Sequence, residues 1–110
     1  MPSLFSRSGN RFASSGVTEI LPSEVIDSIW FVIDMDLQGF YELNDLLVFE
    51  LKNNFGNLSF YFSQEDEITQ MGIDTKFSYS ALYPSKIFVG DDGDKQTIFL
   101  PKEFKTEQIL

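Results

Sequence analysis

The sequence contains neither histidine nor cysteine among its 110 residues. This excludes disulfide bonds, imidazole or thiolate metal ligands, a cysteine nucleophile and a histidine acid–base catalyst. Basic residues are also scarce, because 8 Lys and Arg stand against 17 Asp and Glu, for a formal net charge of −9. Such a surface repels phosphate backbones and anionic lipids, so we expect no direct nucleic-acid partner and no membrane partner. A basic protein is the expected partner.

Long hydrophobic runs are missing as well. The longest apolar stretch, Ile29–Ile33, is far too short to span a bilayer. The first ten residues hold only Leu4 and Phe5 as large apolar side chains, which does not match a secretory signal. Because small secreted domains usually carry disulfides, the lack of cysteine favours a cytoplasmic protein.

Aromatic residues are abundant, with 12 Phe, 4 Tyr and 1 Trp. They suit a packed, β-rich core, and the length fits one domain. We expect a flexible N-terminal segment over residues 1–10, a single α+β domain over residues 11–104, and a C-terminal tail over residues 105–110.

One amphipathic helix is the clearest predicted element. Pro22 suits its first turn, and Glu24 and Asp27 lie near its N-terminus, where the helix dipole favours them. Apolar residues recur at helical spacing and predict one buried face, with Gly39 a plausible end. The residues of that face are Val25, Ile29, Val32 and Ile33, with Trp30 also expected in the core.

Alternating apolar residues predict an antiparallel sheet of about five strands, against which the helix packs. A short edge strand is expected at 11–15. Two hairpins are expected, with turns at 53–57 and 90–94, where Asn, Asp and Gly tolerate left-handed backbone. The acidic segment 64–72 is interpreted as a loop. The remaining strands are expected at 46–52, 58–63, 77–81, 86–89 and 97–100.

Several short motifs, in this order and spacing, resemble a family of small proteins from Firmicutes and their phages, known as a staphylococcal domain of unknown function. The resemblance implies a cytoplasmic protein of a Firmicute, a prophage or a phage, and it implies no known chemistry. Two positions depart from the family pattern, Ser14-Ser15 and Asp94-Lys95. The motifs that carry the resemblance are Arg11-Phe12, Gly16-Val17, Leu21-Pro22, Trp30 with Ile33-Asp34, Val48-Phe49-Glu50-Leu51, Gln64-Glu65, Lys86-Ile87-Phe88-Val89, Asp91-Asp92-Gly93 and Thr97.

The outer side of the helix is the first candidate site. Phe31 and Met35 are four residues apart, so they share a face roughly opposite the buried stripe. Asp27 and Asp34 lie between the two faces. Either the N-terminal segment covers this second apolar face through Leu4, Phe5 and Phe12, or the face binds a partner.

Two acidic segments complete the candidate partner-binding residues: Glu65, Asp66 and Glu67, and Asp91, Asp92 and Asp94. The second segment has oxygen ligands on a turn, but an Asp-Gly hairpin explains it without metal, so no metal and no cofactor are expected. A catalytic carboxylate pair needs a cleft that separates the two pKa values, and so short a chain has little mass for one. We therefore expect no enzymatic activity.

Together these features favour a non-enzymatic, acidic protein-binding module of phage or mobile-element type. One specific form is an inhibitor of a nucleic-acid-handling defence enzyme, as in anti-CRISPR or anti-restriction proteins that mimic nucleic acid. The alternative is a small cytoplasmic or phage-structural module that self-associates, as a homodimer through the apolar helix face.

Overall fold

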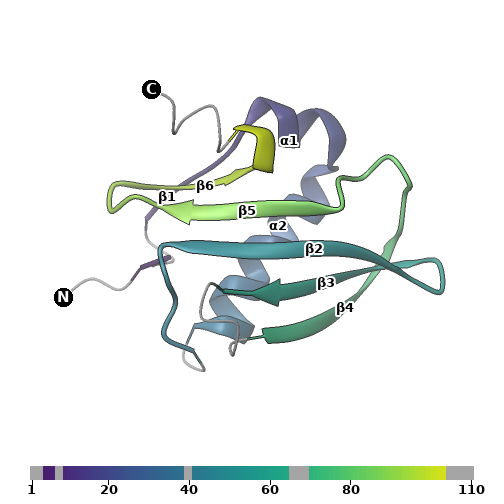
Figure 1. Ribbon diagram of the computed structural model, residues 1–110, viewed down its shortest axis with the longest axis horizontal. Helices are drawn as coiled ribbons and strands as arrows, with labels where there is room; N and C mark the ends of the chain where they lie inside the picture. The colour runs from purple at the N-terminus through teal and green to yellow at the C-terminus, as the bar shows by residue number, and fades with distance from the viewer. Residues whose placement is uncertain (1–3, 7–8, 39–40, 65–69, 104–110) are drawn as a thin grey trace.

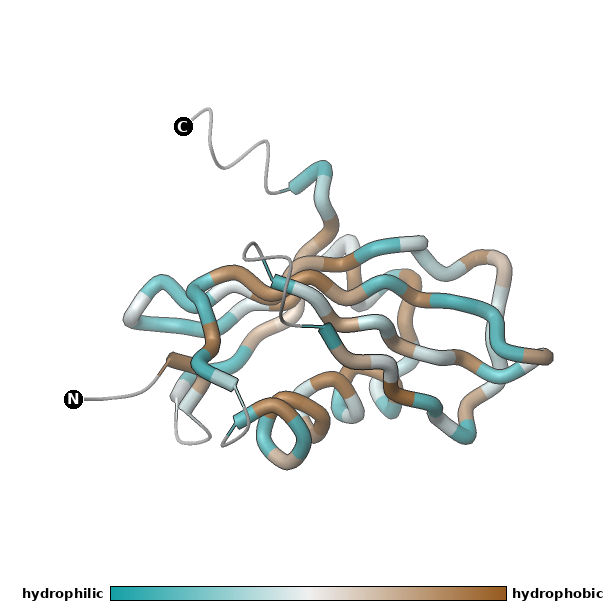
Figure 2. The backbone as a smooth tube through the Cα atoms, turned by 60° about the horizontal axis from the view of Figure 1, so that its bottom comes forward, coloured by the Kyte–Doolittle hydropathy of each residue, from teal (hydrophilic) through white to brown (hydrophobic). Residues whose placement is uncertain are grey.

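The computed structural model describes residues 4–6, 9–38, 41–64 and 70–103. The elements follow in the order β1 (Asn10–Ala13), α1 (Ser15–Ile20), α2 (Ser23–Val32), the π-helical turn η1 (Ile33–Leu37), β2 (Leu46–Asn54), β3 (Asn57–Ser63), β4 (Gln70–Ser78), β5 (Lys86–Asp91) and β6 (Lys95–Phe99). Figure 1 shows α2 behind the strands, and Figure 2 shows the helical layer against one face of the sheet. The predicted α+β class is confirmed.

The sheet has six strands in the order β1-β6-β5-β2-β3-β4. All neighbouring strands are antiparallel except β1 and β6, which run parallel with Phe12 opposite Thr97. The hairpin between β2 and β3 turns at Phe55 and Gly56, within the predicted turn. Six strands fit the expectation of about five, which named a short edge strand and five further segments.

The helix begins where the sequence predicts. Pro22 lies at the N-cap of α2, and the Gln38 N–H donates to the Ile33 carbonyl, five residues back, which closes the π-helical turn. The predicted stripe of Val25, Ile29, Val32 and Ile33 is buried. Gly39, the predicted stop, lies outside the described residues. No helix of the described ranges is long and apolar enough to cross a membrane.

Phenylalanine side chains fill the space between α2 and the sheet. Phe49 on β2 contacts Phe60 on β3 edge-to-face, with ring centroids 6.1 Å apart, and Phe62 at 5.5 Å. All three rings are fully buried, as the alternation of β2 and β3 predicts. Trp30 was expected to be buried as well, but it is only half-buried at the margin of the core.

The strand β4 differs from the prediction. It starts at Gln70, inside the segment interpreted as a loop, and it ends at Ser78, before the predicted Tyr79 and Ala81. Glycine at 72 and the preceding acidic run favour a loop locally. That local preference is outweighed by pairing with β3. The paired residues run from Gln70 opposite Ser63 to Asp74 opposite Ser59.

Phe5 lies in the segment 1–10 that was expected to be flexible. Its side chain is fully buried and belongs to the core cluster. Its backbone φ is 61°, in the left-handed region that is uncommon for a bulky residue. Burial of the aromatic ring therefore offsets a backbone conformation that costs of order 1–3 kcal/mol.

We predict that Phe49→Ala lowers the free energy of unfolding by about 3–5 kcal/mol, because it leaves a cavity between two rings. Phe55→Ala is the matched control, since that side chain is fully exposed. Urea denaturation followed by circular dichroism measures both. Equal effects of the two substitutions would contradict the packing described here.

Candidate protein-binding surfaces

The outer side of the helix carries two exposed apolar side chains, Phe31 on α2 and Met35 on η1, which we call the helix ridge. Their exposed fractions are 62% and 49%. Glu24 and Asp27 of α2 are also exposed, and the sequence from Ser23 to Leu37 contains no basic residue. The ridge is therefore an apolar surface in acidic surroundings.

The alternative in which the N-terminal segment covers Phe31 is wrong. Phe5 is in the core, and Phe12 is 52% exposed on the other face of the sheet. Arg11 points toward the helical layer, where it contacts Asp34 of η1, so its neighbour Phe12 points away from that layer. Phe31 is left at the surface.

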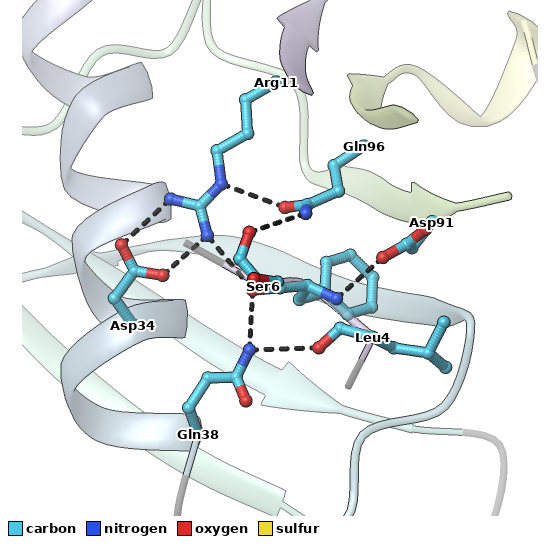
Figure 3. A network of polar contacts seen from close by, with 8 residues as sticks. Leu4, Ser6, Arg11, Asp34, Gln38, Asp91 and Gln96 are labelled. Carbon is cyan, nitrogen blue, oxygen red and sulfur yellow. Dashed lines mark hydrogen bonds and ion pairs between the residues drawn. The ribbon is translucent and has the colours of Figure 1, made fainter. Parts of the chain in front are cut away.

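Asp34, one of the predicted partner-binding residues, forms an ion pair instead. Arg11 Nη1 and Nη2 donate to its two carboxylate oxygens at 2.9 and 2.6 Å. Arg11 also donates to Gln96 Oε1 at 2.9 Å (Figure 3) and to the Phe5 carbonyl at 3.1 Å. Its guanidinium lies 4.8 Å from the Trp30 ring centroid. Both charged side chains are largely buried. Asp34 therefore has a structural role.

The same polar network holds the backbone of the N-terminal segment. The Phe5 N–H donates to Asp91 Oδ2 at 2.7 Å, and Gln38 Nε2 donates to the Phe5 carbonyl at 2.6 Å. Gln96 Nε2 donates to the Ser6 carbonyl at 2.8 Å (Figure 3). These bonds join η1, β5 and β6 to a segment far from them in sequence. They fix Phe5 in the core.

The carboxylates of the turn between β5 and β6 accept hydrogen bonds from the turn itself. Asp91 Oδ1 accepts from the Gly93 N–H, and Asp92 Oδ1 accepts from the N–H groups of Asp94 and Lys95. Gly93 takes a positive φ of 91°, as the turn requires. The described residues contain no cluster of three acidic side chains that would hold a metal ion.

The other predicted acidic segment, Glu65, Asp66 and Glu67, lies outside the described residues. The structure brings Phe31, Met35 and Asp27 together on the helix, and it places Asp91, Asp92 and Asp94 on the separate β5–β6 turn. The candidate residues thus belong to different surfaces.

Sequence reasoning missed a second exposed apolar site, at the tip of the β2–β3 hairpin. Phe55 is fully exposed with a positive φ of 54°, and Leu82 in a nearby loop is 84% exposed. The Tyr79 N–H donates to the Gly56 carbonyl, which joins that loop to the hairpin. The available signal was a phenylalanine at a turn position that usually takes Asn or Gly.

A shallow hollow of about 310 Å³ lies over the outer face of β2, β3 and β4. Lys52 Nζ lies 5.2 Å from the Tyr61 ring centroid there, and Asp74 accepts hydrogen bonds from Asn54 and Ser59. Asp74 is the single carboxylate of the hollow. A carboxylate pair for acid–base catalysis is therefore not assembled at this place.

We predict that Arg11→Ala lowers the free energy of unfolding by about 2–4 kcal/mol, since it removes the two-bond ion pair with the largely buried Asp34 carboxylate and one of the donors to the Phe5 carbonyl. Lys95→Ala, at an exposed basic residue, is expected to change stability by less than about 0.5 kcal/mol. Chemical denaturation measures both. An Arg11 effect as small as that of Lys95 would show that the network does not hold the N-terminal segment.

Asp92 gives a pH prediction. Hydrogen bonds from the backbone N–H groups of Lys95 and Asp94 hold the pKa of its carboxyl below the usual 3.8. The lowered pKa contributes stability above the unfolded-state value, and this contribution is lost as the pH falls through the folded-state value. An NMR titration of the Asp92 carboxyl should give a midpoint below 3.8 that rises on unfolding in urea. A midpoint at or above the usual value would rule out these hydrogen bonds.

Comparison with known proteins agrees with the resemblance described above. The chain is similar to a protein of unknown function from Enterococcus faecalis whose crystal structure has been solved. The two sequences are 51% identical and the two structures superpose with a TM-score of 0.91, over 94% of this chain and 97% of that chain. No curated protein shows significant similarity. The model of a family described as "Staphylococcal protein of unknown function (DUF960)" matches residues 10–103. The chain belongs to this family.

Proposed function

We propose that the protein is a non-enzymatic binding module that captures a partner protein on the helix ridge. The observation that carries the proposal is the exposure of Phe31 beside Met35. An aromatic anchor in an apolar patch with a charged rim is how specific interfaces are built. The absence of histidine and cysteine supports the non-enzymatic part, and the absence of cysteine also supports a cytoplasmic setting.

Charge indicates what kind of partner fits the ridge. Glu24 and Asp27 are exposed near it, and no basic residue occurs between Ser23 and Leu37. Two copies of this surface would repel each other, so the ridge does not favour pairing with itself. A partner with an apolar pocket and basic residues around it is complementary, and long-range attraction would speed its association.

A narrower form of the proposal makes the partner a nucleic-acid-handling defence enzyme, inhibited because the acidic module occupies its nucleic-acid groove. The net charge of −9 supports this form, together with the resemblance to phage proteins. It predicts that DNA or RNA competes with the module for the partner. Binding that persists in excess nucleic acid would leave the broader proposal standing and remove the narrower one.

We predict that Phe31→Ala weakens partner binding by at least about 1–2 kcal/mol, mainly through faster dissociation. Phe12→Ala is the matched control, because Phe12 is also exposed but lies on the opposite face of the sheet. Each variant is immobilised and exposed to a Firmicutes lysate, and a retained protein is then measured by surface plasmon resonance. The expected partner is basic, binds wild type and Phe12→Ala alike, and binds Phe31→Ala weakly.

The charge component is tested with Asp27→Lys, since Asp34 is engaged by Arg11 and its substitution would disturb the fold. Association of this variant should be slower and less sensitive to salt than that of the wild type. A partner that binds Phe31→Ala as tightly as wild type would overturn the assignment of the ridge.

A further inference from the structure

The strand β4 forms one edge of the sheet, and no described strand pairs with its outer side. It has nine residues, whereas β1 at the other edge has four. Tyr41 Oη donates to the Gln70 carbonyl at the start of β4, so the accessible length runs from Gly72 to Ser78. Figure 1 shows this strand at the border of the molecule. A long open edge is a template for another strand.

We propose that two copies of the chain pair through β4, antiparallel, with Thr75 opposite Thr75 of the second copy. The sequence around this centre is self-complementary: Ile73, Asp74, Thr75, Lys76 and Phe77. The pairing sets Asp74 opposite Lys76 of the second copy, twice, and Ile73 opposite Phe77, twice. Opposite charges and apolar pairs directly across strands are the favourable combinations.

Neighbouring registers are less favourable. A register centred on Asp74 sets two aspartates opposite each other, and a register centred on Lys76 does the same for two lysines. A register centred between two residues would turn the exposed face of one copy toward the half-buried face of the other. Charge and face alternation together select Thr75 as the centre, which is also the middle of the accessible length.

The side chains of β4 alternate in a way that suits this pairing. Gly72, Asp74, Lys76 and Ser78 are exposed, whereas Met71, Ile73, Thr75 and Phe77 are half-buried toward the core. A second copy would cover the open sides of Ile73 and Phe77 and add backbone hydrogen bonds. Apolar burial and backbone hydrogen bonds would supply most of the stability of the dimer, because exposed ion pairs contribute little and serve mainly to select the register.

Lys76 on this edge also disfavours pairing with other strands. The register with β3 shifts between Ser59 and Asn57, where Thr75 Oγ1 donates to the Leu58 carbonyl and accepts from the Phe77 N–H. The register shift affects pairing with any strand, a second copy included, so it does not select the partner. Lys76 is selective, because an edge lysine disfavours a strand that places no carboxylate opposite it. An antiparallel copy supplies the carboxylate that neutralises Lys76. Because each copy uses its single β4, the assembly closes as a dimer.

Sedimentation equilibrium of wild type and two variants tests the proposal. Lys76→Asp places two aspartates opposite each other at each end of the pair, and Asp74→Lys does the same with lysines. Each variant alone should dimerise at least about tenfold more weakly than wild type. An equimolar mixture of the two variants restores both opposite-charge pairs and should dimerise again. Lys95→Asp is the matched control for Lys76→Asp, because it makes the same change of net charge at an exposed residue of β6. It should dimerise like wild type.

Asp74→Lys loses the hydrogen bonds from Asn54 and Ser59 and therefore needs a second measurement. The chain has no cysteine, so Asp74→Cys mixed with Lys76→Cys should oxidise to a disulfide-linked dimer between the two variants. A monomeric wild type would overturn the proposal. A dimer that Lys76→Asp leaves intact would also overturn it. The same holds if neither the mixture of the two charge variants nor the mixture of the two cysteine variants forms a dimer. These outcomes do not depend on whether the helix ridge binds a partner.

Discussion

The structure depends on one constraint: a single helical layer must cover one face of a six-stranded sheet. The main helix is short relative to the sheet, so large side chains complete the core, and Phe49, Phe60 and Phe62 meet edge-to-face or tilted beneath it. Phe5 completes the core near the end of η1, although its backbone must adopt a left-handed conformation. The bidentate Arg11–Asp34 pair and its neighbours hold this residue in place. The polar network therefore closes a core that the helix alone leaves open.

The same constraint decides which surfaces stay available. No helix of the described residues covers the outer face of the sheet, and Phe88 and Phe99 on it pack against each other, with ring centroids 5.8 Å apart. No element in the described ranges forms a second layer over the outer side of α2, and Phe31 is exposed. The six described strands do not close into a barrel, so β4 keeps an edge that none of them covers. Both proposed contact surfaces follow from an α+β domain with only two layers.

Local patterns predicted much of this arrangement. The helical spacing of Val25, Ile29 and Ile33 and the alternation around Phe49 and Phe60 located the helix and the central hairpin, because both periods report burial on one side. The start of β4 was missed since Gly72 and the acidic run before it are typical of a loop, whereas residues 70–74 pair with β3. Phe5 was missed because a lone aromatic among Ser, Gly and Asn has no period. The helical spacing placed Phe31 opposite the buried stripe but left open whether the N-terminal segment covers it. The ion pair of Asp34 with Arg11 could not be predicted, because the two residues lie 23 positions apart in the sequence.

The two proposed contacts reinforce each other geometrically. In an antiparallel pair, Asp74 and Lys76 of the second copy point to the same face, so the two-fold axis stands perpendicular to the joined sheet. Both copies of α2 then lie on one side of that sheet, and two helix ridges face the same direction. A partner with two matching sites would meet the second ridge at a high effective concentration, which raises the overall affinity without a new contact. A ridge built on one aromatic anchor and Met35 is small for a tight interface, and the proposed pairing through β4 would compensate for that small area.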